Sequence, residues 1–343
     1  MKAVVFHEHG GPEKLQYEDR PQPQIKPDEV LIRVKACAVN HLDLWVRQGI
    51  PSYQIALPHI SGSDVAGQIE QIGGEVKEFK IGQKVFVSPG LSCGACEQCK
   101  AGRDNLCAAF SVLGARTDGG YAEFVAVPGR NVLPIPGALT FEQAAAFPLV
   151  SVTAWHMIVT LARLRKEETA LIMGAGSGVG SMAIQIAKHT GAKVITTVGS
   201  EEKIKKALAL GADEVINHGV EDITQRVLEL TGGYGVGVVI EHIGPDVWGQ
   251  CLKSLARGGR LITCGATTGG EARVDLRALF SRSLTLKGSY LGTKAELVEA
   301  AKLVGDGKLK PVIDRVYPLK DARAAQEQML SRKFFGKIVL SVG

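Results

Sequence analysis

The sequence predicts an α/β protein in which a mostly β region is combined with a second region built on a doubly wound parallel sheet. Three observations carry this prediction: the length of 343 residues, Val- and Ile-rich runs in the first 150 residues, and a strand–helix alternation after them. A chain of this length usually exceeds what one hydrophobic core serves, so we expect two domains. Its content of 45% hydrophobic and 22% charged residues is typical of a folded globular protein.

The first 150 residues are expected to form mostly β structure. The N-terminal run MKAVVFHEHGG contains a short apolar segment and predicts a first strand. The runs EVLIRVKACAVN, DVAGQIEQIG, QKVFVSP and YAEFVAVP follow, and Gly, Pro and Asp residues separate them. Short Val- and Ile-rich runs bounded by such turn residues are typical of strands.

From about Ser151 strands and helices alternate. The strand TALIMGAG enters a glycine turn, and the helix SMAIQIAKHTG ends at Gly191. The alternation continues through KVITTV, SEEKIKKALALG, EVINH, EDITQRVLELTGG, VGVVIEHIG, VWGQCLKSLARGG and RLITCGA, and SLTLKGSYLG closes it. Strands separated by helices of about ten residues predict βαβ units with right-handed crossovers and a parallel sheet. The remaining tail predicts helix, strand, helix and strand, and we expect its last strand to return to the first domain.

Composition and charge exclude several classes of protein. Net charge is +5, but the 40 basic and 35 acidic residues are interspersed, so we expect no nucleic-acid partner. No apolar run approaches the roughly 20 residues that cross a bilayer, and the N-terminus lacks a signal-peptide pattern, so we expect a cytoplasmic protein without a membrane partner. Seven cysteines without an export signal argue against a disulfide framework. Three of them are scattered and expected to be small buried residues: Cys37, Cys251 and Cys264.

A glycine-rich turn lies between a strand and a helix in LIMGAGSGVGSMAIQIAK. Glycines let the backbone turn tightly and approach a pyrophosphate, whose charge then meets the free N–H groups at the helix start. The spacing matches G-x-G-x-x-G in no register, but the preceding strand, the following helix and the further βα units support a dinucleotide site. The predicted cofactor-binding residues here are Gly174, Gly176, Ser177, Gly178, Val179 and Gly180.

The end of the second strand distinguishes the two nicotinamide dinucleotides. NAD sites place an Asp or Glu there, about 20 residues beyond the glycines, to bind the ribose 2′-OH. This chain has Val198 at that position, followed by Ser200 and, one turn later, Lys203. A small polar residue and a cation suit a 2′-phosphate, so NADP(H) is favoured over NAD(H). Alternatively, Ser200 is a plain helix N-cap, and Glu201 and Glu202 occupy the first turn, where carboxylates are favoured and weigh against a phosphate.

Four cysteines are spaced C-x2-C-x2-C-x7-C within CGACEQCKAGRDNLC, at Cys93, Cys96, Cys99 and Cys107. This spacing lets one loop wrap a tetrahedral ion, and four thiolates leave no open coordination position. A closed site neither binds substrate nor activates water, so we expect one structural zinc per chain. An iron–sulfur cluster would require the last two cysteines to be spaced C-x3-C-P. In this chain seven residues separate Cys99 from Cys107, and Ala108 follows in place of a proline.

The cysteine cluster, the domain order and the glycine turn together resemble the medium-chain dehydrogenase/reductase superfamily over essentially the whole chain. The matching runs also include VKACAVNHLDLW, PHISGSDVAGQI, GGYAEFVAVP, AAAFPLVSVTAW, ALGADEVIN and FFGKIVL. The resemblance implies a chaperonin-10-like catalytic domain over residues 1–151 and 292–343, with a zinc lobe over 90–110. It also implies an inserted Rossmann domain over 152–291 and an oxidoreductase activity that uses NAD(P)H.

Alcohol dehydrogenases of this superfamily also carry a catalytic zinc, and the comparison implies that this chain lacks its three ligands. Asn40 stands at the first ligand position, Ser63 replaces the His of a GHE motif, and Val150 lies near the third. No ordinary catalytic zinc is therefore expected. The alternative is a rearranged metal site formed by His41, His59 and Asp64.

The absence of these ligands bears on the expected reaction. A zinc ion stabilises the alkoxide of an alcohol oxidation by several kcal/mol, and without it hydrogen-bond donors must act alone. Hydride addition to an activated C=C bond or a quinone delocalises the negative charge into an enolate or hydroquinone anion, which needs less electrostatic stabilisation than an alkoxide. We therefore expect an NADPH-dependent quinone oxidoreductase or enoyl reductase. The alternatives are an alcohol or aldehyde dehydrogenase and a non-enzymatic NADPH-binding sensor or structural protein.

The resemblance also suggests roles for single residues and a homo-oligomer. Asn40 and Ser63 are expected to donate to the substrate oxygen, or else to be structural polar residues in a turn. Tyr53 and Trp45 are expected to line the substrate site or to belong to the core. Further contacts expected at the cofactor are Thr153, Gly244, Gly265, Ser289, Tyr290, Leu291 and the phosphate contact Lys337. Relatives are dimers or tetramers that commonly pair edge strands, and SLTLKGSYLG is the candidate edge.

Overall fold

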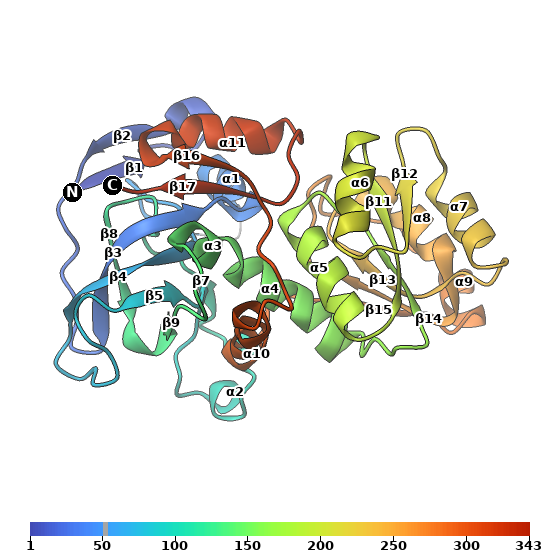
Figure 1. Cartoon of the computed structure of the whole chain (residues 1–343), viewed down its shortest axis with the longest axis horizontal. Helices are drawn as coiled ribbons and strands as arrows, with labels where there is room; N and C mark the ends of the chain where they lie inside the picture. The colour runs from blue at the N-terminus through green and yellow to red at the C-terminus, as the bar shows by residue number, and fades with distance from the viewer. Residues whose placement is uncertain (51–53) are drawn as a thin grey trace. The chain divides into compact units, whose positions relative to one another are not determined.

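The computed structural model describes residues 1–50 and 54–343 (Figure 1). The chain forms two compact units. The first unit comprises residues 1–149, 293–307 and 311–343, and the second comprises residues 150–292 and 308–310.

A seven-stranded sheet forms the centre of the first unit. The strand order is β16–β17–β3–β4–β5–β9, and β8 pairs with β3 off this path. Because β17 pairs antiparallel with β3, the last strand of the chain joins a sheet formed largely by its first 134 residues. The strands are β3 (Glu29–Ala38), β4 (Asp64–Ile72), β5 (Lys84–Val87), β8 (Phe124–Pro128), β9 (Val132–Pro134), β16 (Ile313–Pro318) and β17 (Lys337–Ser341).

Shorter elements surround this sheet. Two small antiparallel sheets pair β1 (Lys2–Val5) with β2 (Gln16–Asp19), and β6 (Gly90–Leu91) with β7 (Ser111–Val112). The helices are α1 (His41–Gln48), α2 (Glu97–Lys100), α3 (Phe141–Ala146), α10 (Lys294–Gly305) and α11 (Ala322–Leu330). Short 3₁₀ turns occur at Pro12–Lys14, Asp104–Leu106, Gly129–Asn131 and Leu319–Asp321.

The core of the first unit consists mainly of Val, Ile and Leu side chains from the strands. On β3, Val30, Ile32 and Val34 point to one face and are 1% exposed or less, and Leu31, which points to the other face, is also fully buried. Cys37, also on β3, is buried, and burial raises the pKa of its thiol well above its usual range. This agrees with its expected role as a small core residue.

The second unit is a six-stranded sheet whose strands are parallel throughout. Their order is β12–β11–β10–β13–β14–β15, which within this unit corresponds to 3-2-1-4-5-6, the order of dinucleotide-binding folds. The predicted α/β class and doubly wound parallel sheet are therefore confirmed. The strands are β10 (Thr169–Ile172), β11 (Lys193–Val198), β12 (Glu214–Asn217), β13 (Val236–Glu241), β14 (Leu255–Thr263) and β15 (Thr285–Gly288).

Five helices of the second unit lie between these strands in sequence. α5 packs on β10 and β11, α6 packs on β11 and β12, and α8 packs on β13 and β14. The order reverses between β10 and β13, and in such sheets ligands bind beyond the carboxyl ends of the strands at that reversal. The helices are α5 (Gly178–His189), α6 (Glu202–Ala209), α7 (Ile223–Leu230), α8 (Pro245–Ser254) and α9 (Leu276–Ser281).

One helical stretch, Phe141–Leu161, is long and apolar enough to cross a membrane by length and composition. It includes α3, α4 (Pro148–Trp155) and a π-helical segment (His156–Leu161). The expectation that no apolar run reaches this length is therefore wrong. Because 67% of its apolar window is buried inside the structure, the stretch resembles a core helix of a soluble protein.

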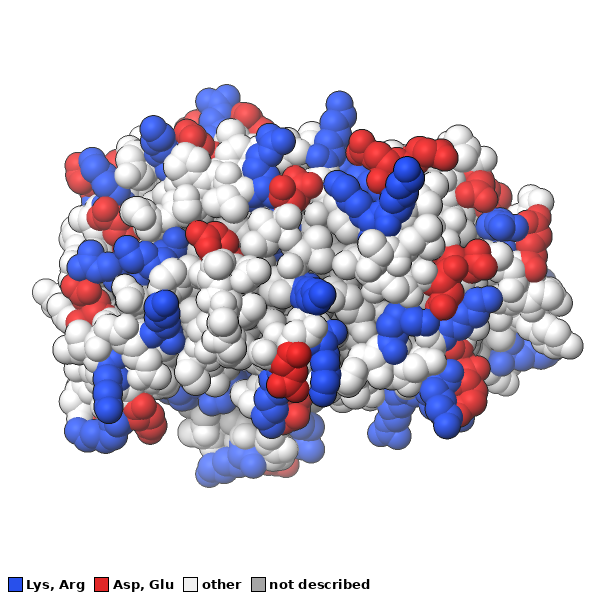
Figure 2. Space-filling model, in the orientation of Figure 1, with Lys and Arg blue, Asp and Glu red and all other residues white. Residues whose placement is uncertain are grey.

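Charged side chains are mixed on the face shown in Figure 2, where Lys and Arg alternate with Asp and Glu. Some of them form ion pairs, such as Lys188 with Asp213 at 2.9 Å and Lys302 with Glu299 at 2.6 Å. Pairs of this exposed kind contribute about 0–1 kcal/mol each, so they do not determine the fold.

Candidate functional site

The glycine turn lies at the carboxyl end of β10 and leads into α5. Gly174 has a φ of +65°, a conformation that favours glycine. A Cβ at Gly180 would lie only 2.1 Å from the Gly174 carbonyl oxygen, so no side chain fits there. Ser177 caps α5, because its Oγ accepts the Gly180 N–H at 2.8 Å. The other N–H groups of a first helical turn lack intrahelical partners, so this turn can bind a pyrophosphate.

Two residues at the end of β13, the buried Glu241 and the half-buried His242, support this turn. His242 Nε2 lies 3.0 Å from Ser177 Oγ, and burial lowers the pKa of His242. The fully buried Glu241 accepts the Gly244 N–H at 2.6 Å and the Thr263 hydroxyl at 2.8 Å. Sequence reasoning misses both residues, because the pairing of β10 with β13, and not their spacing in the sequence, brings them to the turn.

The remaining predicted cofactor residues of this unit lie mainly beyond strand ends. Gly244 follows β13 with a φ of +106°, and at Gly265, after β14, a Cβ would lie 2.4 Å from the His242 carbonyl oxygen. Ser289 follows β15, and its N–H donates to the Thr263 carbonyl at 2.8 Å. Parallel-sheet geometry predicts this edge for cofactor contacts, which stay predictions for these residues. The other residues of the set in this unit are Tyr290, Leu291 and Thr153.

The position that selects between the two dinucleotides lies at the end of β11. Val198, where NAD sites carry a carboxylate, is 2% exposed. The Ser200 Oγ is buried and has no hydrogen-bond partner among the described residues, so the plain N-cap interpretation of Ser200 is wrong. Lys203 lies in the first turn of α6. His218, just beyond β12, is a neighbour that sequence reasoning misses: its Nε2 would lie 3.2 Å from a Cβ at Gly199.

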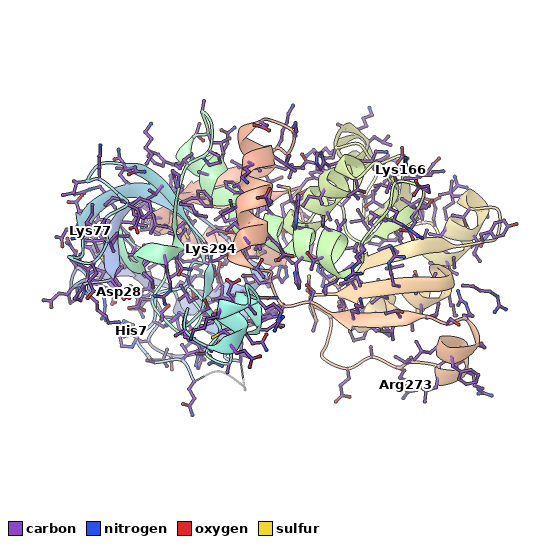
Figure 3. All side chains as sticks on the ribbon, turned by 90° about the horizontal axis from the view of Figure 1, so that it is seen from below. His7, Asp28, Lys77, Lys166, Arg273 and Lys294 are labelled. Atoms are coloured by element: carbon purple, nitrogen blue, oxygen red, sulfur yellow. The ribbon has the colours of Figure 1, made fainter. Side chains whose placement is uncertain are left out.

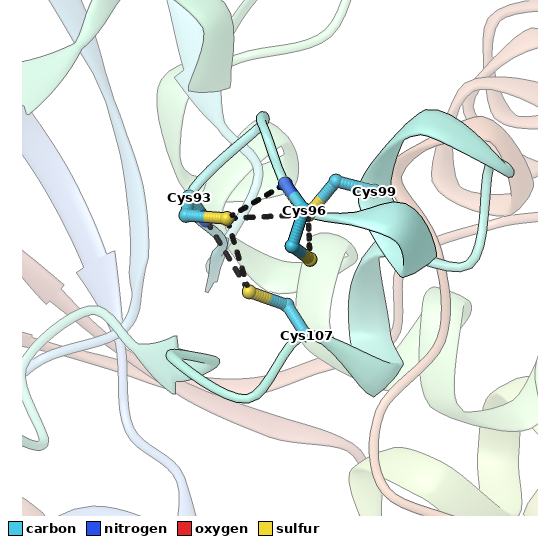
Figure 4. Close-up of side chains that lie close together, drawn as sticks. All are labelled: Cys93, Cys96, Cys99 and Cys107. Atoms are coloured by element: carbon cyan, nitrogen blue, oxygen red, sulfur yellow. Dashed lines mark hydrogen bonds between the residues drawn. The ribbon is translucent and has the colours of Figure 1, made fainter.

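The four cysteines converge in the loop that carries α2 (Figure 4). Their Sγ atoms all lie within 4.8 Å of one another, with 3.5 Å between Cys96 and Cys99 and 3.5 Å between Cys93 and Cys107. The N–H groups of Ala95 and Cys96 donate to Cys93 Sγ and lower the pKa of that thiol to about 6. Four sulfurs at this separation fit a tetrahedral zinc ion and leave no open coordination position.

The cysteine lobe, residues 90–110, is joined to the first turn of α10. The Asp104 carboxylate accepts the Lys294 N–H at 3.2 Å, and the Lys294 ammonium donates to the Arg130 carbonyl at 2.8 Å. Arg130 Nη2 in turn donates to the carbonyl of Ser92, the neighbour of Cys93, at 2.9 Å. Lys294, which is labelled in Figure 3, therefore connects the lobe to α10 directly through Asp104 and indirectly through Arg130.

Asn40, Asp64 and Lys337 form a closed, buried network in the first unit. Asn40 Oδ1 accepts from Lys337 Nζ at 2.5 Å, and Asn40 Nδ2 donates to Asp64 Oδ2 at 3.0 Å. Lys337 Nζ also donates to Asp64 Oδ2 at 3.0 Å, and Asp64 Oδ1 accepts the Leu149 N–H at 2.8 Å. The three residues are 6%, 0% and 3% exposed, so the ion pair is removed from water.

This network corrects two predictions. Lys337 is not an exposed contact for a cofactor phosphate, because its ammonium is buried and bound to Asn40 and Asp64. Asn40 is not a free donor for a substrate oxygen, because its Nδ2 donates to Asp64 at 3.0 Å and to the Ala38 carbonyl at 3.4 Å. Its contacts join the end of β3 to the first residues of β4 and β17.

Ser63 is the predicted donor that the network leaves available. It is fully buried, and its Oγ has no hydrogen-bond partner in the described part of the chain. The preceding Gly62 has a φ of +110°, and a Cβ there would lie 2.6 Å from the Tyr121 ring and 2.8 Å from Cys37 Sγ. This close packing fixes the backbone that carries Ser63. Ser61 has an equally buried hydroxyl without a described partner.

A second buried carboxylate adjoins the network from α1. Asp43 Oδ2 accepts the Asn40 N–H at 2.8 Å and the Tyr121 hydroxyl at 3.0 Å. Burial raises the pKa of Asp43 to about 6. Farther along α1, the fully buried Arg47 donates from Nε to Gln326 at 2.7 Å. Buried polar side chains that are hydrogen-bonded in this way stabilise the core only while each of them keeps its hydrogen-bond partner.

The structure does not support a rearranged metal site at His41, His59 and Asp64. His59 Nε2 pairs with the Gly114 carbonyl at 3.0 Å, and burial lowers the pKa of His59. His41 begins α1, and its ring centroid lies 6.0 Å from that of Trp45. Within residues 1–50 and 54–343, the cysteine set is the one group of three or more His, Cys, Asp or Glu that could hold a metal. The predicted Tyr53 lies outside the described residues.

The chain matches known proteins over its whole length. The family described as "Zinc-binding dehydrogenase" matches residues 178–306, and "Alcohol dehydrogenase GroES-like domain" matches residues 26–137. The chain is 34% identical to an NAD-dependent alcohol dehydrogenase of Sulfolobus acidocaldarius, with 100% of both chains covered. It is 35% identical to a quinone oxidoreductase of Rattus norvegicus, over 99% of this chain and 97% of that protein. A crystal structure of an NAD-dependent alcohol dehydrogenase, 44% identical with 100% of both chains covered, has a TM-score of 0.97.

Proposed function

Because this chain belongs to the medium-chain dehydrogenase/reductase superfamily of oxidoreductases, we propose that it transfers hydride from NADPH to an activated C=C bond or a quinone. The observation that carries the proposal is the Asn40–Asp64–Lys337 network. Asn40 occupies the first position expected for a catalytic metal ligand, and an ammonium group lies 2.5 Å from its amide oxygen. A second cation beside that ammonium would be repelled, and the ligands to hold it are lacking.

Ser63 is the hydroxyl that we infer to donate to the oxygen of the substrate. Its Oγ is buried and uncommitted within the described residues, so a hydrogen bond to substrate would break no other contact. One such donor suits an enolate or hydroquinone anion, in which the negative charge is delocalised. A localised alkoxide needs the stronger stabilisation that a metal ion supplies.

The second unit is the proposed binding site for the dinucleotide, which supplies the hydride when bound. The free N–H groups at the start of α5 bind the pyrophosphate. The Ser200 hydroxyl and the Lys203 ammonium bind the 2′-phosphate of NADPH, since the apolar Val198 replaces the carboxylate that would select NADH.

We infer that the four cysteines hold one zinc ion with a purely structural role, since a four-thiolate site is closed. We also propose a cytoplasmic homodimer or homotetramer that acts on a small molecule. β15 ends the six-stranded sheet, and the preceding α9 leaves Leu276 68% and Phe280 71% exposed. An open strand edge beside exposed apolar residues suits pairing with a second copy.

The proposal is tested with purified protein, NADPH and a panel of quinones, enones, enoyl thioesters and aldehydes, with zinc counted in parallel. We expect turnover of a quinone or enone, and kcat/KM should fall about ten- to hundredfold in S63A, because one donor to the developing anion is lost. The matched control is S61A, which removes an equally buried hydroxyl two residues away and should leave turnover unchanged. Equal effects of the two variants would contradict the role of Ser63.

An alcohol or aldehyde dehydrogenase is the second candidate. It is favoured by the likeness to the archaeal alcohol dehydrogenase and by the two glutamates, Glu201 and Glu202, beside Ser200. NAD⁺-dependent oxidation of alcohols, with no reduction of quinones or enones, would establish it in place of the first.

A further inference from the structure

We propose that the first unit binds a single chloride ion between the side chains of Arg47 on α1 and Gln326 on α11. Both residues are 0% exposed, and each has a side-chain nitrogen that donates to no partner in the described part of the chain. The inference is independent of the proposed reaction, because the hydride transfer uses neither side chain.

Arg47 is a buried cation whose hydrogen bonds supply no opposite charge. A guanidinium stays charged at neutral pH, and a buried charge is normally paired with an opposite one. Arg47 Nε donates to Gln326 Oε1 at 2.7 Å and Nη1 donates to the Gly10 carbonyl, but both acceptors are neutral. Within residues 1–50 and 54–343, Arg47 forms no ion pair with a carboxylate. Its positive charge therefore lacks a counter-charge inside the core.

Two carboxylates of the first unit come near Arg47 in space or in sequence, but neither neutralises it. Burial lowers the pKa of Arg47, and the charge of Glu13 opposes this effect. Glu13 is exposed, however, so water screens its interaction with the buried cation. Asp43 precedes Arg47 by one turn of α1, and its Oδ2 accepts the Tyr121 hydroxyl at 3.0 Å instead of a guanidinium N–H.

The two nitrogens without acceptors, Arg47 Nη2 and Gln326 Nε2, lie on neighbouring groups. Nη2 is bonded to the same guanidinium carbon as Nε, and Nε2 is bonded to the same amide carbon as Oε1. Because Nε and Oε1 are hydrogen-bonded at 2.7 Å, the two nitrogens belong to one local cluster. The Tyr121 hydroxyl lies near the Gln326 amide but forms no hydrogen bond with its nitrogen. Two such donors suit a ligand that only accepts hydrogen bonds.

A chloride ion suits this cluster better than a water molecule does. Water could accept from both nitrogens and donate to the unpartnered Asp43 Oδ1, but it would leave the guanidinium charge uncompensated. Chloride accepts the same two hydrogen bonds and also supplies the negative charge, and hydrogen bonds between ionised groups are about twice as strong as neutral ones. The bound ion joins α1 to α11, which come from opposite ends of the chain.

The test compares urea unfolding in sodium chloride and in sodium gluconate at the same ionic strength, so that general screening is equal in both salts. The informative variant is Q326E, whose carboxylate supplies a counter-charge to Arg47 with a side chain of nearly the same size. The matched control is Q328E, which adds the same charge at a half-buried position on the same helix. In parallel, crystals of the parent protein grown with sodium bromide locate the ion by anomalous scattering.

We expect chloride to lower the equilibrium constant for unfolding about tenfold relative to gluconate in the parent protein and in Q328E, the effect of a ligand at about ten times its dissociation constant. Q326E should unfold equally in both salts, and the parent crystals should show one bromide ion beside Arg47 Nη2. 

Two results would overturn the proposal. Equal stability of the parent protein in both salts, with no bromide ion at Arg47, would show that water fills this role. Chloride stabilisation of the same size in Q326E would show that the ion binds elsewhere. The bromide experiment uses the parent protein alone, so it decides the question even if Q326E does not fold.

Discussion

Replacement of Lys337 by Met tests whether the buried network is as important to stability as its geometry implies. The substitution keeps an unbranched stem but removes the ammonium that donates to Asn40 Oδ1 and Asp64 Oδ2. Within the described residues, Asp64 then remains a buried carboxylate that keeps the Leu149 N–H and the Asn40 amide as its donors. Loss of one partner from a buried ion pair costs about 3–5 kcal/mol, and we expect the free energy of unfolding of K337M to fall by that amount near pH 7.

The assay is urea unfolding followed by circular dichroism, which gives the change in unfolding free energy. The matched control is K2M, which breaks the exposed pair of Lys2 with Asp19, whose side chains are 43% and 77% exposed, and should cost less than about 1 kcal/mol. The double variant D64N/K337M should regain part of the loss, because a neutral amide replaces the stranded carboxylate. A cost for K337M no greater than that for K2M, or strictly additive effects of D64N and K337M, would show that the buried network does not stabilise the fold.

Three further predictions concern pH, the metal and the cofactor. Burial raises the pKa of Asp43 from 3.8 to about 6 in the folded state, so the stability contributed by its protonated form is full below pH 4 and is lost as the pH rises through 6. This loss amounts to about 3 kcal/mol of unfolding free energy. Between pH 4 and 7, the unfolding free energy measured in urea should therefore change less with pH in D43N than in the parent protein. The same pH dependence in both proteins would contradict this. Removal of zinc by a chelator, and separately D104N, should each speed hydrogen exchange at the Lys294 N–H about tenfold, whereas the exposed lobe variant E97Q should not. Unchanged exchange after both changes would show that the Asp104 contact does not protect the Lys294 N–H. In G199E, the ratio of kcat/KM for NADPH to that for NADH should fall at least about tenfold, because the new carboxylate repels a 2′-phosphate and accepts a hydrogen bond from a ribose hydroxyl. An unchanged ratio would show that the 2′-phosphate binds elsewhere.

Local patterns predicted the features that depend on neighbours in sequence. The C-x2-C-x2-C-x7-C spacing predicted four sulfurs that converge, because one loop carries them all. The strand–helix alternation predicted the parallel sheet, since a helix between two strands requires a crossover. The glycine turn was found despite its unusual spacing, because a strand precedes it and a helix follows.

Sequence reasoning failed where distant segments meet. Lys337 lies 297 residues from Asn40, and the pairing of β17 with β3 brings its ammonium to the amide. Nothing in the run FFGKIVL distinguishes a buried ion-paired lysine from an exposed one, so the sequence wrongly suggests a phosphate contact for Lys337. His218 was missed for the same reason, because it reaches the end of β11 through strand pairing.

The apolar stretch Phe141–Leu161 shows a different limit. Its length and composition suit a membrane, and only its packing reveals that 67% of its apolar window is covered by the protein itself. Composition reports how apolar a helix is, whereas the tertiary structure decides what covers it.

We propose that this enzyme transfers hydride without a catalytic metal, while its zinc ion has a structural role. The most direct measurement is the zinc content per chain of the purified protein together with its turnover of quinones, enones and alcohols. We predict one zinc ion per chain, lost when Cys93 and Cys96 are replaced by Ser, and NADPH oxidation by a quinone or an enone. Two zinc ions per chain, with alcohol oxidation that disappears when the more weakly held ion is removed, would contradict the account.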